Sequence, residues 1–122
     1  MKNILFLACI IGLMSISVAY AKCDGGTEIT NSVGTIFCRS NVKMNWWSAY
    51  SWCKANGREM ATIYDLCPNW DGTEKYKCSA IGNRELWTST AYSDYKGIKL
   101  GADGYPYWDA RNFSPTYHAA CK

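Results

Sequence analysis

Six cysteines follow residue 21, and the last of them, Cys121, lies one residue before the end of the chain. An even number of cysteines in a short exported chain is typical of a disulfide framework. The chain has a single histidine and no Cys-x-x-Cys pair, so the same cysteines would make a poor zinc site. We therefore expect a small domain held together by disulfides, with a pairing that cysteine spacing alone leaves open.

The first 21 residues have the organisation of a signal peptide. Lys2 precedes an apolar run from Ile4 to Val18, and Ala19-Tyr20-Ala21 places small residues where a signal peptidase cuts. The run of 15 residues is shorter than the roughly 20 that cross a membrane. We predict a signal peptide at 1–21, and a single domain at 22–122 that is secreted, periplasmic or at the cell surface, with no membrane span.

The net charge and its distribution do not indicate a binding partner for this domain. The whole chain carries a net charge of +3, and its lysines and arginines are scattered singly. Nucleic-acid binding requires a basic stripe as well as aromatic residues, and only the aromatic residues are present. We therefore expect no nucleic-acid partner, and the oligomeric state stays open.

A helix is predicted between Asn45 and Gly57. Asn45 is a favoured N-cap residue, and glycine is favoured just beyond a helix end. Apolar residues between them recur at the spacing of one buried face. The predicted buried positions are Trp46, Ala49, Tyr50 and Cys53, and the predicted solvent positions are Ser48, Ser51 and Lys54.

The remaining elements are short. Turn formers beside β-branched residues predict a hairpin between Cys23 and Cys38, closed most simply by a disulfide between these two cysteines. A second helix is predicted at 62–66, ending before Pro68. A polar stretch lies between Cys67 and Cys78, and strands are predicted at 86–90, 97–100, 105–108 and 118–121. The order indicates an α+β fold with a small antiparallel sheet.

The helix segment resembles the C-type lectin-like domain, in a short form of bacterial style. That family's first helix has the pattern Trp-x-x-Ala-x-x-x-Cys, which Trp46, Ala49 and Cys53 match. The family continues with a glycine and a Leu-Ala-x-Ile segment, here Gly57 and Met60-Ala61-Thr62-Ile63. The resemblance implies a C-type lectin-like fold with an N-terminal hairpin, two helices, a small sheet and three disulfides. The implied pairs are Cys53–Cys121, Cys23–Cys38 and, by elimination, Cys67–Cys78.

The family's calcium site is mostly absent from this chain. Members bind calcium with Glu-Pro-Asn or Gln-Pro-Asp in a loop and with Trp-Asn-Asp on a later strand. No such proline triplet lies between Trp87 and Trp108, and Trp108-Asp109-Ala110 keeps one of the two later ligands. The resemblance therefore implies binding without calcium, and we expect neither a metal nor a cofactor. Phe113 lies near the position of an inner cysteine that many members have, so that bridge is missing.

Aromatic residues crowd the C-terminal third among small polar residues. Rigid rings beside adaptable hydrogen-bonding groups are typical of a recognition surface. In the lectin-like fold this segment forms loops and ligand-facing strands, which implies a glycan or a protein as the ligand. Taken singly, Trp108 and Phe113 are better explained as core packing. The candidate ligand-binding residues are Tyr92, Tyr95, Tyr105, Tyr107, Trp108, Asp109, Arg111, Asn112 and Tyr117.

The run from Tyr105 to His118 also resembles the variable region of retroelement-diversified bacterial and phage lectin-like proteins. Mutagenesis of adenines in Asn codons yields Tyr, Asp, Ser, Asn, His, Phe, Pro and Ala, and the run is rich in these residues. Diversification of this region is therefore a hypothesis that gene sequences from several strains would test.

Two other functions stay open. Glu59 and Glu85 could supply the carboxylate pair of a small secreted glycosidase, although no motif surrounds either of them. The domain could instead be a structural subunit of a surface assembly. His118 is the only histidine, so we expect a structural role for it and predict no catalytic residue.

Overall fold

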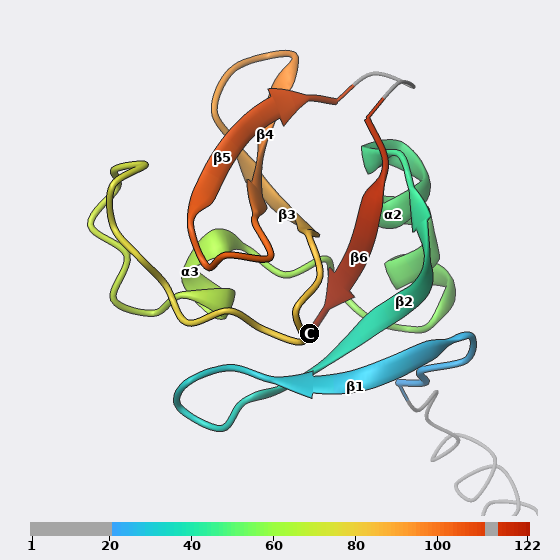
Figure 1. Cartoon of the computed structure of the whole chain (residues 1–122). Helices are drawn as coiled ribbons and strands as arrows, with labels where there is room; N and C mark the ends of the chain where they lie inside the picture. The colour runs from blue at the N-terminus through green and yellow to red at the C-terminus, as the bar shows by residue number, and fades with distance from the viewer. Residues whose placement is uncertain (1–20, 112–114) are drawn as a thin grey trace, which may run out of the picture.

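A six-stranded sheet organises the fold, with the strands in the order β1-β2-β6-β3-β4-β5 (Figure 1). The structure is a computed structural model, and it describes residues 21–111 and 115–122. The predicted signal peptide, apart from Ala21, and the residues Asn112 and Phe113 lie outside these ranges. The strands are β1 (Gly26–Thr30), β2 (Ile36–Met44), β3 (Leu86–Ala91), β4 (Lys96–Leu100), β5 (Pro106–Ala110) and β6 (Tyr117–Cys121). With the helices α2 (Trp46–Ala55) and α3 (Ile63–Leu66), they form a small α+β domain, as the sequence predicts.

One pair of neighbouring strands departs from the predicted antiparallel sheet. β3 and β6 run parallel, with Leu86 beside His118, whereas the other neighbours are antiparallel. Antiparallel pairing follows directly when a hairpin joins two strands. β3 and β6 are instead separated in the chain by β4 and β5. β6 lies between β2 and β3, antiparallel to the first and parallel to the second.

The helix α2 begins and ends as its sequence predicts. The Asn45 side chain accepts a hydrogen bond of 2.8 Å from the Ser48 N–H. At the other end, Gly57 has a φ of 68° and its N–H donates to the Lys54 carbonyl at 2.9 Å. Glycine adopts this left-handed conformation without steric cost, and it therefore ends the helix.

Tyr50 is a correction to the predicted buried face of α2. Trp46, Ala49 and Cys53 are buried, but Tyr50 is 40% exposed. Because the large Trp46 indole fills the space beside it, the Tyr50 ring stacks on that indole at the edge of the buried face, with 5.7 Å between centroids. Lys54, on the solvent side as predicted, lies 5.5 Å from the Tyr50 ring.

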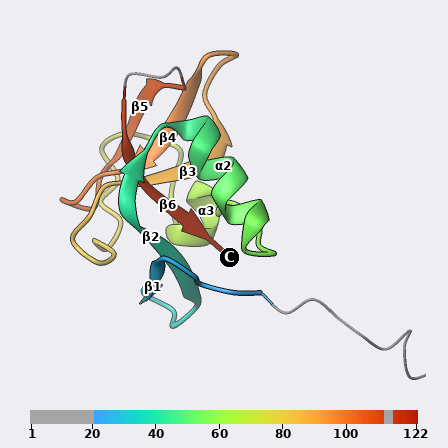
Figure 2. The ribbon, with the colours of Figure 1, turned by 90° about the vertical axis from the view of Figure 1, so that its right-hand side faces the viewer.

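The sheet separates two hydrophobic clusters. Neighbouring residues of one strand enter different clusters, as Leu86 and Trp87 do, because successive strand residues point to opposite faces. α3 packs into the cluster of Leu86, and α2 into the cluster of Trp87. Figure 2 shows α2 beside β2 and β6. Trp46 ties α2 to the sheet, since its Nε1–H donates to the buried Thr88 carbonyl at 2.8 Å.

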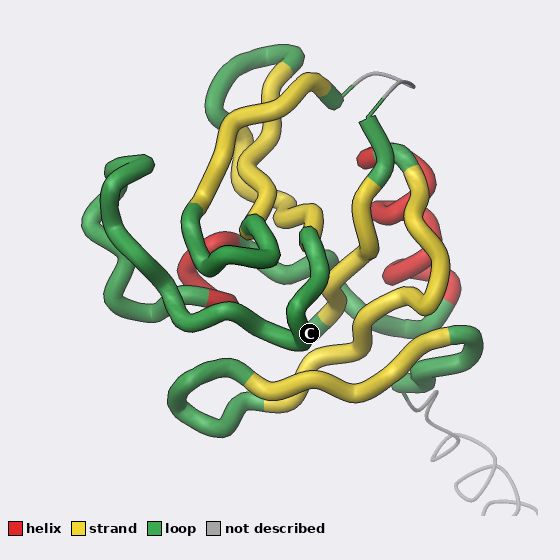
Figure 3. The backbone as a smooth tube through the Cα atoms, in the orientation of Figure 1, coloured by secondary structure: helices red, strands yellow, loops and turns green. Residues whose placement is uncertain are grey.

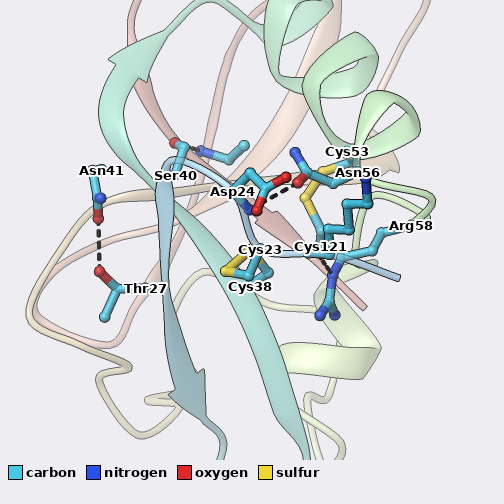
Figure 4. The surroundings of a disulfide bond; sticks show 12 residues. Cys23, Asp24, Thr27, Cys38, Ser40, Asn41, Cys53, Asn56, Arg58 and Cys121 are labelled. Atoms are coloured by element: carbon cyan, nitrogen blue, oxygen red, sulfur yellow. Dashed lines mark hydrogen bonds between the residues drawn. A yellow bond between two sulfur atoms is a disulfide. The ribbon is translucent and has the colours of Figure 1, made fainter. Parts of the chain in front are cut away.

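Three disulfides stabilise this arrangement. They are Cys23–Cys38, Cys53–Cys121 and Cys67–Cys78, the same pairs that the resemblance implies. Figure 4 shows the first two lying close together, where the N-terminal segment meets the end of α2. There the Asp24 N–H donates to the Asn56 side chain at 3.0 Å.

A long connection joins α3 to β3. Residues 67–85 contain neither helix nor strand and form the large loop at the left of Figure 3. Cys67–Cys78 closes its first part, and the Cys78 N–H donates to the Gly104 carbonyl at 2.8 Å. The loop is therefore attached to the turn between β4 and β5.

Candidate ligand-binding surface

The β4–β5 pair divides the predicted site residues between two faces. Tyr107 lies opposite Lys99, Trp108 opposite Ile98 and Asp109 opposite Gly97. Because side chains alternate along a strand, Tyr107 and Asp109 share one face, and Trp108 lies on the other. These three predicted residues therefore lie on two faces of the sheet and do not form one surface.

Trp108 and Tyr92 line a groove beside the long loop. Their rings meet edge to face, with 5.1 Å between centroids. The groove has a volume of about 590 Å³, and residues 73–75 of the loop form its opposite wall. We call it the Tyr92 groove. Its lining residues are Thr73, Glu74, Lys75, Tyr92, Lys96 and Trp108.

The Tyr92 groove combines aromatic area with polar groups. Tyr92 is 61% exposed, while Trp108 is half-buried, consistent with a role between core packing and ligand contact. The Trp108 Nε1–H is buried and has no hydrogen-bond partner among the described residues. A buried donor of this kind is costly unless a water or a ligand satisfies it. Lys75, Lys96 and Glu74 add charged side chains to the lining.

Lys99 contacts several side chains on the face of the sheet that carries Tyr107 and Asp109. Its ammonium pairs with the Glu85 carboxylate and lies 3.9 Å from the Tyr117 ring centroid and 5.5 Å from that of Tyr107. The Tyr117 hydroxyl donates to Asp109. We call these residues, together with Asp103, the Lys99 cluster; it borders a hollow of about 320 Å³.

The pKa shifts in the Lys99 cluster follow from burial and pairing. Burial lowers the pKa of Lys99, but hydrogen bonds to Glu85 and Tyr117 outweigh it and leave this pKa raised. Burial and the bond to Asp109 raise the pKa of Tyr117, and the bond to Asp103 raises the pKa of Tyr107. At neutral pH the lysine stays charged and both phenols stay protonated. Lys99, Tyr107 and Tyr117 are therefore hydrogen-bond donors at neutral pH.

Arg111 holds the turn between β3 and β4. Its guanidinium donates to the backbone carbonyls of Ser93, at 3.3 Å, and Asp94, at 2.6 Å, and lies 4.8 Å from the Trp46 ring centroid. Tyr95, on the same turn, is 67% exposed. Arg111 thus supports the turn that presents Tyr92 and Tyr95, in addition to any contact with a ligand.

The remaining predicted residue, Tyr105, lines neither the Tyr92 groove nor the hollow beside the Lys99 cluster. Its half-buried ring has the Lys77 ammonium 5.9 Å from its centroid, next to the disulfide-closed loop. Its backbone N–H donates to the Asp103 side chain at 3.1 Å. Tyr105 therefore contributes to the β4–β5 turn rather than to the Tyr92 groove.

Sequence reasoning missed the lysines of the Tyr92 groove and of the Lys99 cluster. Lys96 and Lys99 lie on β4, which was predicted as a strand, but neither belongs to a motif. Lys75 lies in a stretch that looked like polar loop sequence. Strand alternation would have placed Lys99 beside Tyr107, but only after the β4–β5 register was known.

The alternative catalytic residues are already engaged. The Glu59 carboxylate pairs with Lys54 at 2.8 Å, and Glu85 pairs with Lys99. His118 is 6% exposed, and its Nδ1–H donates to the Ser40 carbonyl at 2.7 Å.

Comparison with known proteins gives no family for the chain: no family model, no curated protein and no solved structure matches it. Within residues 21–111 and 115–122, no helix is long and apolar enough to cross a membrane. These residues also contain no group of three or more His, Cys, Asp or Glu side chains placed to hold a metal ion.

Proposed function

We propose that this protein is an exported binding module of the C-type lectin-like type that captures a glycan through the Tyr92 groove without calcium. The observation that carries the proposal is the groove itself. An exposed tyrosine and a half-buried tryptophan meet edge to face there, opposite a polar loop.

The frame supports the lectin-like part of the proposal. The first long helix is linked to the last strand by Cys53–Cys121, and an N-terminal hairpin is closed by Cys23–Cys38. Both features are those that the family resemblance implies. Loops carried on a rigid frame are frequent recognition sites.

The size and chemistry of the groove favour a glycan over a protein surface. Its volume of about 590 Å³ lies within the range of roughly 300–1,000 Å³ that is usual for small-molecule sites. The apolar face of a sugar ring can pack on the rings of Tyr92 and Trp108. Thr73, Lys75 and Lys96 are then available for its hydroxyl groups, which supplies the few polar contacts that fix orientation.

The carboxylates give the hydrolase alternative no comparable support. Glu59 exchanges backbone hydrogen bonds with Lys122, and Glu85 accepts one from His118. His118 on β6 and Lys122 just after it are four positions apart, so the backbones of Glu59 and Glu85 lie about 13 Å apart, since a strand rises roughly 3.3 Å per residue. Each carboxylate is paired with a lysine, Lys54 or Lys99, whereas the two carboxyl groups of a glycosidase face each other across about 5 to 9.5 Å.

A glycan array tests the proposal. We expect the purified domain, residues 22–122, to be retained on a subset of glycans, and Tyr92→Ala to reduce retention at least about tenfold, as the loss of one stacking ring implies. Tyr64→Ala is the matched control, because Tyr64 is also exposed but lies on α3 outside the groove. The melting temperature should fall by a similar few degrees in both variants, because each loses one aromatic pair, Tyr92–Trp108 or Tyr64–Trp70.

Other results would reject the proposal in distinct ways. If Tyr92→Ala and Tyr64→Ala reduce glycan retention equally, the groove is not the binding site. Retention only on protein arrays would indicate a protein ligand, and self-assembly of the purified domain would indicate a structural subunit. Cleavage of arrayed glycans that is lost in Glu59→Gln or Glu85→Gln would restore the hydrolase alternative.

A further inference from the structure

A third hollow lies where β2, β6 and the segment before β3 meet. Its volume is about 390 Å³, and nothing in the predicted ligand-binding set lines it. We call it the Arg39 hollow. Its lining residues are Arg39, Asn41, Lys43, Asn83, Arg84, Glu85, Ala102 and His118.

Positive charge dominates the Arg39 hollow. Arg39, Lys43 and Arg84 contribute three cations to its wall, and Glu85 contributes the one carboxylate. That carboxylate is already paired with Lys99, which lies outside the hollow. The cations come from separate parts of the chain, with Arg39 and Lys43 on β2 and Arg84 just before β3. The sequence shows no basic run because the fold, rather than the order of residues, gathers them.

The Arg39 guanidinium makes one long hydrogen bond and retains an N–H donor without a partner among the described residues. It is half-buried, and its Nη1–H donates to the Gly82 carbonyl at 3.4 Å, a long bond. A Cβ at Gly82 would lie 3.3 Å from the same nitrogen, so the guanidinium packs closely against the glycine backbone. The Arg39 Nε–H is buried and has no partner among the described residues. A charged donor in this position gains from a negatively charged acceptor.

The pKa of His118 is affected by the same three cations. Burial is the main cause that lowers its pKa, and Arg39, Arg84 and Lys43 each lower it further. Its Nδ1–H is bonded to the Ser40 carbonyl, which fixes the ring beside the cations. Three cations therefore act on one small buried region.

We propose that the Arg39 hollow binds an oxyanion, namely a carboxylate, sulfate or phosphate group, with Arg39 as the central donor and with Arg84 and Lys43 as supporting charges. Arginine presents a planar set of donors that matches the oxygens of such groups. The proposal does not depend on the Tyr92 groove, because the two hollows share no lining residue.

Titration with inorganic sulfate tests the site in the folded domain. The side-chain NMR signal of His118 is a direct probe, because the chain has one histidine. Ionic strength is held constant with chloride, and parallel titrations with inorganic phosphate and acetate distinguish the three oxyanions. We expect a saturable shift of the His118 signal and a rise in the pKa of His118 when the anion is bound, since a nearby negative charge favours the imidazolium.

Variants assign the response to the proposed cations. Arg39→Gln and Arg84→Gln should each weaken sulfate affinity about tenfold, the scale of one charged hydrogen bond. Lys54→Gln on α2, which also removes one positive charge, should leave it unchanged. Without any anion, Arg84→Gln should raise the pKa of His118, because one of the cations that lowers it is gone.

Three outcomes would overturn the proposal. They are the same response to sulfate, phosphate, acetate and chloride, no saturation with any oxyanion, or unchanged affinity in the arginine variants. If the half-buried Arg39→Gln variant does not fold, the exposed Arg84→Gln and Lys43→Gln variants decide the matter, and wild-type affinity in both rejects the site. Loss of glycan capture in the Tyr92 groove has no bearing on these results.

Discussion

Cys38 on β2 lies directly opposite Cys121 on β6, so two of the three disulfides meet at neighbouring positions in the sheet. Through Cys23 and Cys53, these two strands are covalently linked to the N-terminal segment and to α2 (Figure 4). All four cysteines belong to a region where backbone from both halves of the chain converges. The stability of the domain therefore depends strongly on this point.

Removal of the Cys53–Cys121 disulfide should destabilise the domain more than removal of the Cys67–Cys78 disulfide. With a sequence separation of 68 it closes the longest loop, and the chain-entropy account assigns such a loop about 4 kcal/mol. Cys67–Cys78 closes a loop with a separation of 11, for which the same account gives about 3 kcal/mol. The test is urea unfolding of Cys53→Ala/Cys121→Ala beside Cys67→Ala/Cys78→Ala. A larger loss for the second pair would contradict the expectation.

Asn45→Ala should lower the free energy of unfolding by about 1 kcal/mol, because it leaves the Ser48 N–H at the start of α2 without its cap. Ser51→Ala is the matched control, since Ser51 lies on the solvent side of the same helix. Chemical denaturation of both variants measures the difference. Equal stability of the two variants would show that the cap contributes nothing.

The domain should lose stability as the pH falls below about 6.5. The pKa of His118 is lowered from its ordinary value of 6.5, chiefly by burial, so the unfolded chain takes up a proton before the folded one does. The contribution of His118 to the free energy of unfolding is then constant above pH 6.5. It decreases as the pH falls towards the lowered pKa of the folded state, and it levels off below that.

Denaturation between pH 7.5 and pH 5 tests this dependence. His118→Asn is the appropriate comparison, because an amide can still donate to the Ser40 carbonyl but does not titrate. In His118→Asn, the free energy of unfolding should no longer decrease between pH 6.5 and pH 5. If wild type and variant show the same slope, other groups cause it.

Glycan capture by the Tyr92 groove should persist in EDTA. Within the described part of the chain no cluster of metal-ligating side chains is present, and Asp109, at the position where the family resemblance implies a calcium ligand, accepts a hydrogen bond from Tyr117. Retention on an array with EDTA and with added calcium measures the dependence. Capture that is lost in EDTA and returns with calcium would contradict calcium-independent binding.

The helices could be predicted from sequence because their signals are local. Asn45 and Gly57 mark the limits of α2, and Thr62 caps α3 in a reciprocal pair with Asp65. The parallel pair of β3 and β6 could not be predicted, since it depends on where a distant strand enters the sheet. Tyr50 was misplaced because helical spacing does not show that a neighbouring indole already fills the space.

The candidate site was predicted only in part, for the same reason. Residue type drew attention to Tyr92 and Trp108, and the structure brings their rings together. Strand alternation moves Tyr107 and Asp109 to the opposite face, which composition cannot reveal. The Arg39 hollow had no sequence signal at all, because Arg39 and Arg84 are 45 positions apart in the printed sequence.

Gly104 lets the disulfide-closed loop lie directly against the turn between β4 and β5. It has a φ of 90°, and a Cβ there would lie only 2.2 Å from the Cys78 carbonyl oxygen. Since no side chain separates the two backbones, the loop that carries residues 73–75 can approach the sheet edge closely. A single methyl group at position 104 would therefore force the backbone at Cys78 away from the β4–β5 turn.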